Sequence, residues 1–144
     1  MNVNLINDII NDYTKLYNEL YKKNYSSLND LLDKSKKDLN SLKEEILSVK
    51  EISLIKIDFL SEKNKNFILC IKHSLNNKLY KYIFDFLNIL KKFIQYKLWT
   101  KNNSHETINL MKEISDYPKN GIECQYNVID VLQTLLFGSF FVLN

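Results

Sequence analysis

Apolar residues return at helical spacing along most of the chain and predict one amphipathic helix after another. The first stripe covers residues 5–21, and Lys22, Lys23 and Asn24 end it. In the second stripe the spacing alternates between four and three residues, as in a coiled-coil seam. Its positions are Leu28, Leu32, Ser35, Leu39, Leu42, Ile46 and Val49. Ser27 and Asp30 predict a capping-box start for this helix.

The middle of the chain is harder to assign. Apolar residues are dense over residues 52–60, and a strand over 53–60 is an alternative, but the strong helical patterns on either side favour helix. The polar residues 61–66 predict a linker, followed by a short apolar piece over 67–71. Asn76 and Asn77 then predict a tight turn.

The clearest helix is expected from Leu79 to about Leu98. One face is apolar and the other polar, and extra apolar residues widen the first face, so this helix should pack between neighbours. The apolar set is Leu79, Ile83, Phe86, Leu87, Ile89, Leu90, Phe93, Ile94 and Tyr96.

Two further helices are expected after a loop at 101–103. The first covers 104–115, with Asn103 and Glu106 as its capping pair and Ile108, Met111 and Ile114 inward. Residues 117–121 are a strong turn signal. The last helix begins near Ile122 and is expected to bury Val128, Ile129, Leu132, Leu135 and Leu136.

This succession of helices with short connections predicts an all-α fold. Only 2 Gly and 1 Pro interrupt 144 residues, so long helices are expected. The rhythm of short and long helices after residue 67 is typical of a helical-hairpin array, an α-solenoid fragment of the HEAT or armadillo kind. We expect residues 1–27 to form an N-terminal amphipathic helix extension and residues 28–144 to form the array.

Composition weakens arguments from abundance. The chain has no Ala and no Arg, and it is rich in Asn, Lys, Ile, Tyr and Phe, which AT-rich codons encode. Its 20 Lys are spread among 17 acidic residues, for a net charge of +3. A nucleic-acid interface usually concentrates its charge and uses Arg, so no nucleic-acid partner is expected.

No motif in the chain supports catalysis or a cofactor. There is no Gly-rich phosphate loop, no zinc-binding spacing and no nucleophile elbow. Cys70 and His73 share a helix face, but a buried thiol beside a helix-end histidine explains them more simply than a catalytic pair. Cys124 also has apolar neighbours. We expect a protein that is not an enzyme and has no metal or cofactor.

The chain shows no signal peptide and no continuous apolar span. Asp130, Gln133 and Thr134 interrupt the most apolar stretch, 128–143, which is typical of a buried core helix. We therefore expect a cytoplasmic protein. One amphipathic edge could face a protein partner or a membrane surface, although an ordinary solvated rim has the same pattern. Its residues are Lys91, Lys92, Phe93, Tyr96 and Trp99.

Three stretches resemble one known family. Residues 31–45 read LLDKSKKDLNSLKEE, residues 78–94 carry a lysine followed by a leucine-rich stripe, and residues 125–136 carry a Gln and a Leu-Leu pair. In this order and spacing, over residues 28–137, they resemble the dimerisation and cyclophilin-binding domain of the large Sec7-type Arf exchange factors and the related Mon2 proteins. The family uses Ala, Gly and Pro where this chain has few or none, and residues 1–27 have no clear counterpart.

The resemblance implies a helical-hairpin array for self-association and protein docking in Golgi and endosome traffic, without exchange activity. It implies protein partners, a possible homodimer, and peripheral association with membranes through those partners. The chain ends soon after the apolar run 137–143, as if a longer array were cut, and an exposed last repeat would favour association. The alternative is a coiled-coil or helical-bundle scaffold, held by the seam from Leu28 to Val49 and unrelated to traffic.

Overall fold

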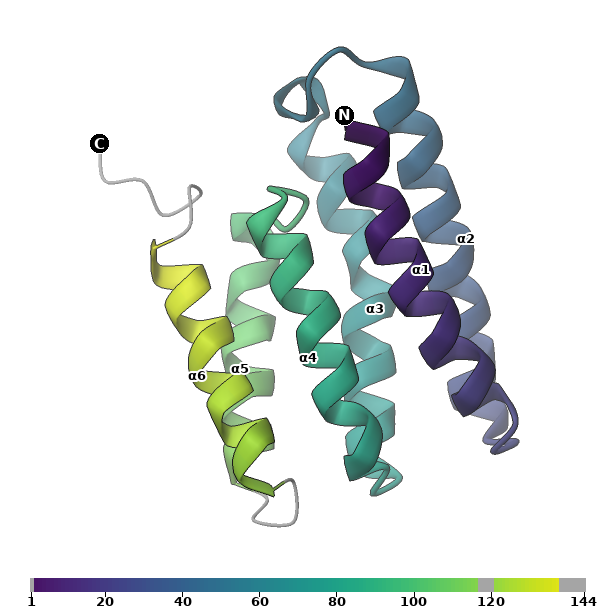
Figure 1. Ribbon diagram of the computed structural model, residues 1–144, viewed down its shortest axis with the longest axis vertical. Coiled ribbons are helices and arrows are strands. Elements are labelled where there is room, and N and C mark those ends of the chain that lie inside the picture. The colour runs from purple at the N-terminus through teal and green to yellow at the C-terminus, as the bar shows by residue number, and fades with distance from the viewer. Residues whose placement is uncertain (1, 117–120, 138–144) are drawn as a thin grey trace.

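The computed structural model describes residues 2–116 and 121–137, and in that part the chain is all-α (Figure 1). The described α-helices are α1 (Asn2–Tyr21), α2 (Ser26–Ser48), α3 (Ile57–Asn76), α4 (Tyr80–Gln95), α5 (Ser104–Ser115) and α6 (Gly121–Phe137). Two 3₁₀ turns, η1 (Ile52–Leu54) and η2 (Lys101–Asn103), lie in the connections. The predicted all-α hairpin array is confirmed, whereas its extension into a solenoid stays a prediction.

The helices form two layers. In Figure 1, α1, α4 and α6 lie in front of α2, α3 and α5, and contacts join the layers from α1–α2 to α5–α6. Helix α4 packs against α1, α3 and α6, which confirms that this helix lies between neighbours. Few residues of α4 are therefore exposed, namely Lys81, Asp85 and Gln95.

One core runs through the described helices, and Phe67 of α3 lies near its centre. The Phe67 ring centroid is 5.1 Å from that of Phe93, 5.8 Å from that of Phe86 and 6.3 Å from those of Tyr13 and Trp99. Helix α1 contributes buried side chains to this same core, so it is an integral part of the bundle. The α2 seam is also covered within the chain, from Leu28 to Ile46.

The segment before α3 is neither a continuous helix nor a strand. Val49, Glu51, Ile55 and Lys56 have extended backbones, and η1 lies among them. The helix expected over residues 52–60 is therefore wrong for residues 52–56 and is confirmed only from Ile57, where α3 begins.

The predicted linker at residues 61–66 is wrong, because these residues lie inside α3. Two of its polar side chains face inward and are buried, Ser61 and Asn64. Asn64 Nδ2 donates to Leu98 O and to Asn103 Oδ1, both at 3.0 Å. Ser61 Oγ and Thr100 Oγ1 share a hydrogen bond of 2.6 Å. Partners far away in the sequence thus bond the Ser61 hydroxyl and the Asn64 Nδ2 group, which look solvent-facing when read locally, while Asn64 Oδ1 is buried without a hydrogen-bond partner among the described residues.

Neither predicted cap forms. Helix α2 begins at Ser26 with Tyr25 at its N-cap, and no side chain there bonds the helix end. Asn103 does precede α5, but its side chain accepts from Asn64 and Thr100 and donates to Ser61 O instead of capping the helix. The Asn103 side chain, which the local pattern predicts to be a helix cap, therefore bonds the buried network instead.

Two helices end at lysines in the left-handed backbone region, where glycine is usual. Lys78 follows α3 with φ 60°, and Lys97 follows α4 with φ 64°. After Lys97, Leu98 N donates to Phe93 O at 2.9 Å, and Lys97 N donates to Ile94 O at 3.1 Å, which is the Schellman pattern. After Lys78, Leu79 N donates to Ser74 O at 2.9 Å in the same way.

We expect Asn64→Ala to lower the free energy of unfolding by about 2 kcal/mol, because Leu98 O loses its buried donor and the network loses its centre. Urea denaturation followed by circular dichroism measures this value. The control is Asn18→Ala on the exposed side of α1, which should change it by no more than about 0.5 kcal/mol. Equal effects of the two variants would show that the network contributes no stability.

Candidate protein-interaction surfaces

The five residues of the predicted amphipathic edge do not share one surface. Phe93 and Trp99 are buried in the core, whereas the side chains of Lys91, Lys92 and Tyr96 are half-buried. Lys91 reaches α6, and Lys92 and Tyr96 reach α1. Any contact of this edge with a partner stays a prediction that rests on these three half-buried residues.

Lys92 holds α4 to α1 through two carboxylates. Its Nζ atom lies 2.9 Å from Asp8 Oδ1 and 2.6 Å from Asp12 Oδ2, and Tyr96 OH donates to Asp8 Oδ2 at 2.7 Å. The hydrogen bond from Lys92, followed by that from Tyr96, holds the pKa of Asp8 below its usual value. The pKa of Lys92 is raised, mainly by its hydrogen bond to Asp12. These ionised groups tie two helices of the front layer together.

Lys91 makes the corresponding link on the other side of α4. Its Nζ atom donates to Asn127 Oδ1 at 2.7 Å and lies 3.5 Å from Asp130 Oδ2, both on α6. Asn127 is buried, and its Nδ2 donates to Asn88 Oδ1 at 3.1 Å and to Phe84 O at 3.3 Å. This contact fixes which side of α6 faces α4.

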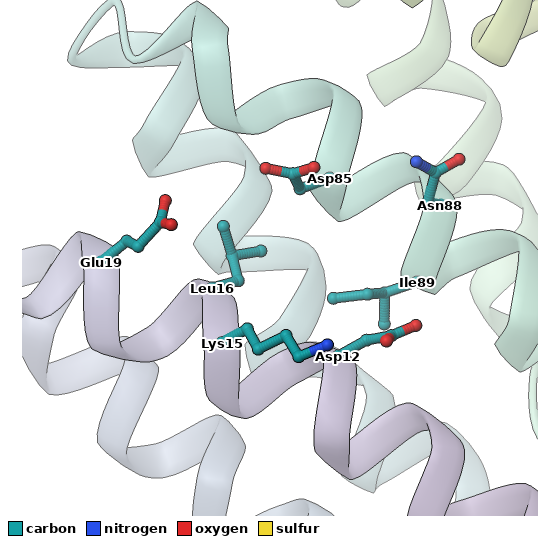
Figure 2. Close-up of a pocket in the computed structure, with 7 residues that line it drawn as sticks. All are labelled: Asp12, Lys15, Leu16, Glu19, Asp85, Asn88 and Ile89. Atoms are coloured by element: carbon teal, nitrogen blue, oxygen red, sulfur yellow. The ribbon is translucent and has the colours of Figure 1, made fainter.

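An acidic groove of about 330 Å³ lies between α1 and α4. Figure 2 shows Glu19 of α1 and Asp85 of α4 on either side of Leu16, with Lys15 and Asp12 further along. Burial, and secondarily the charge of Glu19, raises the pKa of Asp85. The groove thus brings together three carboxylates, those of Asp12, Glu19 and Asp85, with the single lysine Lys15.

The cysteines lie in apolar surroundings. Cys70 is fully buried, and burial raises the pKa of its thiol well above the ordinary range. Burial also raises the pKa of Cys124 to about 11. Thiolates are the reactive form of cysteine, so a raised pKa disfavours reaction of either thiol near neutral pH.

The described ranges, 2–116 and 121–137, contain neither a metal-binding cluster nor a membrane-spanning helix. No group of three or more His, Cys, Asp or Glu side chains in these ranges is placed to hold a metal ion. Among the helices of the same ranges, none is long and apolar enough to cross a membrane.

Helices α5 and α6 carry five of the exposed large apolar side chains of the described residues. Ile108, Ile129 and Leu136 were expected to face inward, but they are exposed, and only Met111, Ile114, Val128 and Leu135 of that set are fully buried. Together with Ile122 and Tyr126, these three exposed residues form a surface that we call the outer face, and each member is between 43% and 69% exposed. Its members are Ile108 of α5 and Ile122, Tyr126, Ile129 and Leu136 of α6.

The outer face includes a groove between the two helices. This groove, of about 370 Å³, is mostly apolar and open to solvent. Its lining residues are Ile108, Met111, Lys112, Ser115, Gln125, Val128, Ile129 and Leu132. Helix α6 is thus apolar towards α4 and α5 and apolar again on the opposite side. An amphipathic surface helix needs only one such side, so the second side is available for a partner.

Sequence periodicity narrows the outer face to one of two apolar stripes on the last helix. Ile122, Tyr126, Ile129 and Leu136 follow a stripe at intervals of four, three and seven residues, with the neutral Gln133 in the gap. The pattern contains two apolar stripes, but it does not say which one faces the bundle. The buried Asn127 decides this, because its hydrogen bonds to α4 turn the other stripe outward. The turn predicted at residues 117–121 lies mostly outside the described residues.

No protein-family model, no curated protein and no solved structure matches this chain. The resemblance to the dimerisation and cyclophilin-binding domain therefore stays a prediction, and the fold and its surfaces carry the functional argument.

We expect Lys92→Met to lower the free energy of unfolding by about 1 kcal/mol near neutral pH, because two carboxylates lose their shared cation while the stem is kept. The pKa of Asp8 is lowered in the fold, so this stabilisation is present above the ordinary pKa of Asp. It is lost as pH falls through the lowered value. Urea titrations at several pH values and salt concentrations measure the difference between the variants.

The matched control is Lys37→Met, at an exposed position of α2. A difference for Lys92→Met that stays the same in acid and in high salt would assign the effect to packing of the lysine stem rather than to charge.

We expect both thiols to react slowly in the native protein. At slightly alkaline pH, a disulfide reagent such as DTNB should label them at least about a hundredfold more slowly than free cysteine, and fully once denaturant unfolds the chain. Fast labelling of Cys70 in the folded protein would contradict this expectation and restore the catalytic reading of Cys70 and His73.

Proposed function

We propose that this chain is a non-catalytic protein-interaction module that self-associates through the outer face. The observation that carries the proposal is the second apolar stripe of α6, which the bundle leaves uncovered. Fully burying one large aliphatic side chain contributes about 1.5–3 kcal/mol. A face with several such side chains is more typical of an interaction site than of a free surface.

A second copy of the chain is the partner that fits this face best. Ile122 precedes Ile129 by seven residues, and Leu136 follows it by seven, so these two side chains are placed symmetrically about Ile129. If two α6 helices pair antiparallel around a two-fold axis, Ile129 meets its own counterpart and Ile122 meets Leu136 of the second copy. Closed dimers use one patch twice in this way. The stripe carries no charge that would repel its copy.

The alternative scaffold would associate through the α2 seam. From Leu28 to Ile46 that seam is buried against α1 and α3 inside one molecule, so the geometry favours the outer face instead. A place in Golgi and endosome traffic, with peripheral membrane association through partners, remains part of the proposal on the strength of the sequence resemblance alone.

Light scattering over a range of concentrations tests self-association. We expect a concentration-dependent dimer, and both Ile129→Glu and Ile129→Lys should weaken it by at least a hundredfold, because like charges meet on the two-fold axis (about 3 kcal/mol for the two copies). Mixing the two variants should restore a heterodimer, since the opposite charges then face each other.

Leu47→Glu is the matched control, because Leu47 of α2 is 61% exposed but lies outside the outer face. A strictly monomeric wild-type chain would overturn self-association and direct the search to a different protein. If both Ile129 variants weaken the dimer but their mixture forms no heterodimer, the symmetric arrangement is contradicted.

A further inference from the structure

A second apolar groove, of about 380 Å³, lies where η1, the start of α3 and the α4–η2 connection meet. We call it the end groove. It shares no lining residue with the outer face. Its lining residues are Ile52, Ser53, Ile55, Ile57, Leu60, Lys97, Trp99, Thr100 and Lys101.

The floor of the end groove is apolar and firmly held. Ile55, Leu60 and Trp99 are buried beneath it. Trp99 Nε1 donates to Thr107 Oγ1 at 2.9 Å, and Thr100 bonds Ser61 of α3. The buried network thus joins the two walls, so the groove exists before any ligand arrives, which reduces the cost of binding.

The apolar surface continues past the mouth of the end groove. Ile57 is 60% exposed at the first turn of α3, and Leu54 of η1 is 63% exposed beside it. A small molecule is usually enclosed by its pocket, whereas this groove is about half open to solvent. Its shape therefore suits the side chains of an extended or helical peptide better than an enclosed small ligand.

The charged residues among those that line the end groove are both lysines, the exposed Lys97 and Lys101. Among the described residues, no carboxylate lies within ion-pair distance of either ammonium group. Glu51 and Asp58 lie on the flanking segments and are not lining residues, although Glu51 Oε2 accepts from the Oγ atom of the lining residue Ser53 at 3.3 Å. Lys97 occupies the left-handed position after α4, so the helix end fixes where its side chain begins.

We propose that the end groove binds an acidic amphipathic peptide segment of a partner protein. Two or three large apolar side chains of the segment pack on Ile57, Leu60 and Trp99, and neighbouring Asp or Glu side chains pair with Lys97 and Lys101. Apolar burial supplies most of the affinity, while the two lysines select acidic over basic segments and make the binding sensitive to salt.

Trp99 is the chain's single tryptophan and lines the groove, so energy transfer from it reports peptide binding, and the variants of the lining residues locate that binding. The probe is a dansyl-labelled synthetic peptide with Leu and Phe at helical spacing and Glu between them; a copy with Lys in place of Glu is its counterpart. We expect Trp99-sensitised dansyl emission with the acidic peptide, and affinity at least tenfold weaker for the basic peptide. The double variant Lys97→Glu/Lys101→Glu should reverse this preference.

Lys34→Glu/Lys37→Glu is the matched double variant, because it makes the same change of charge at exposed positions of α2. Ile57→Ser should weaken both peptides, and circular dichroism checks that each variant is folded. The proposal is overturned if the wild-type chain binds both peptides equally or shows no sensitised emission with either. It is also overturned if the two double variants lose the same affinity for the acidic peptide. Binding of decanoate without binding of the acidic peptide also overturns it and assigns the groove to a small apolar anion.

Discussion

The contact on which this fold depends is the buried hydrogen-bond network around Asn64. Asn64 lies in the middle of α3, yet its amide group bonds the connection between α4 and α5 through Leu98 O and Asn103 Oδ1. Ser61 and Thr100 repeat the link one turn away. Buried polar groups are costly when unpaired, so alternative packings that separate α3 from this connection are disfavoured. The network thereby sets the position of α5 against α3, and α6 then packs on α5.

Polar contacts between helices also explain why one side of α6 is left uncovered by the bundle. Lys92 and Lys91 extend from α4 to α1 on one side and to α6 on the other, and both occupy the polar strip of a helix that has neighbours on three sides. Asn127 settles the rotation of α6, because its amide is buried against α4. Once that rotation is set, the geometry of the helix turns the stripe from Ile122 to Leu136 away from the bundle.

Sequence patterns predicted the helices well where the pattern was regular and local. The first two stripes and the helix after Asn77 lie close to where periodicity places them, because a 3.6-residue repeat specifies an inward face without reference to distant residues. Prediction was wrong where long-range partners decide. Ser61 and Asn64 look like linker residues and Asn103 looks like a cap until the α4–η2 connection is in place. Both candidate surfaces needed the fold, since α6 offers two apolar stripes and the end groove joins segments about forty residues apart.

The scarcity of glycine shapes one of these surfaces. Described residues other than glycine occupy the left-handed region at Asn24, Lys78 and Lys97, at a cost of about 1 kcal/mol each compared with glycine. With 2 Gly in 144 residues, residues with side chains occupy left-handed positions after helices where glycine is common. At Lys97 this has a chemical consequence. Glycine there would end α4 with less strain, but it would remove one of the two cations that line the end groove.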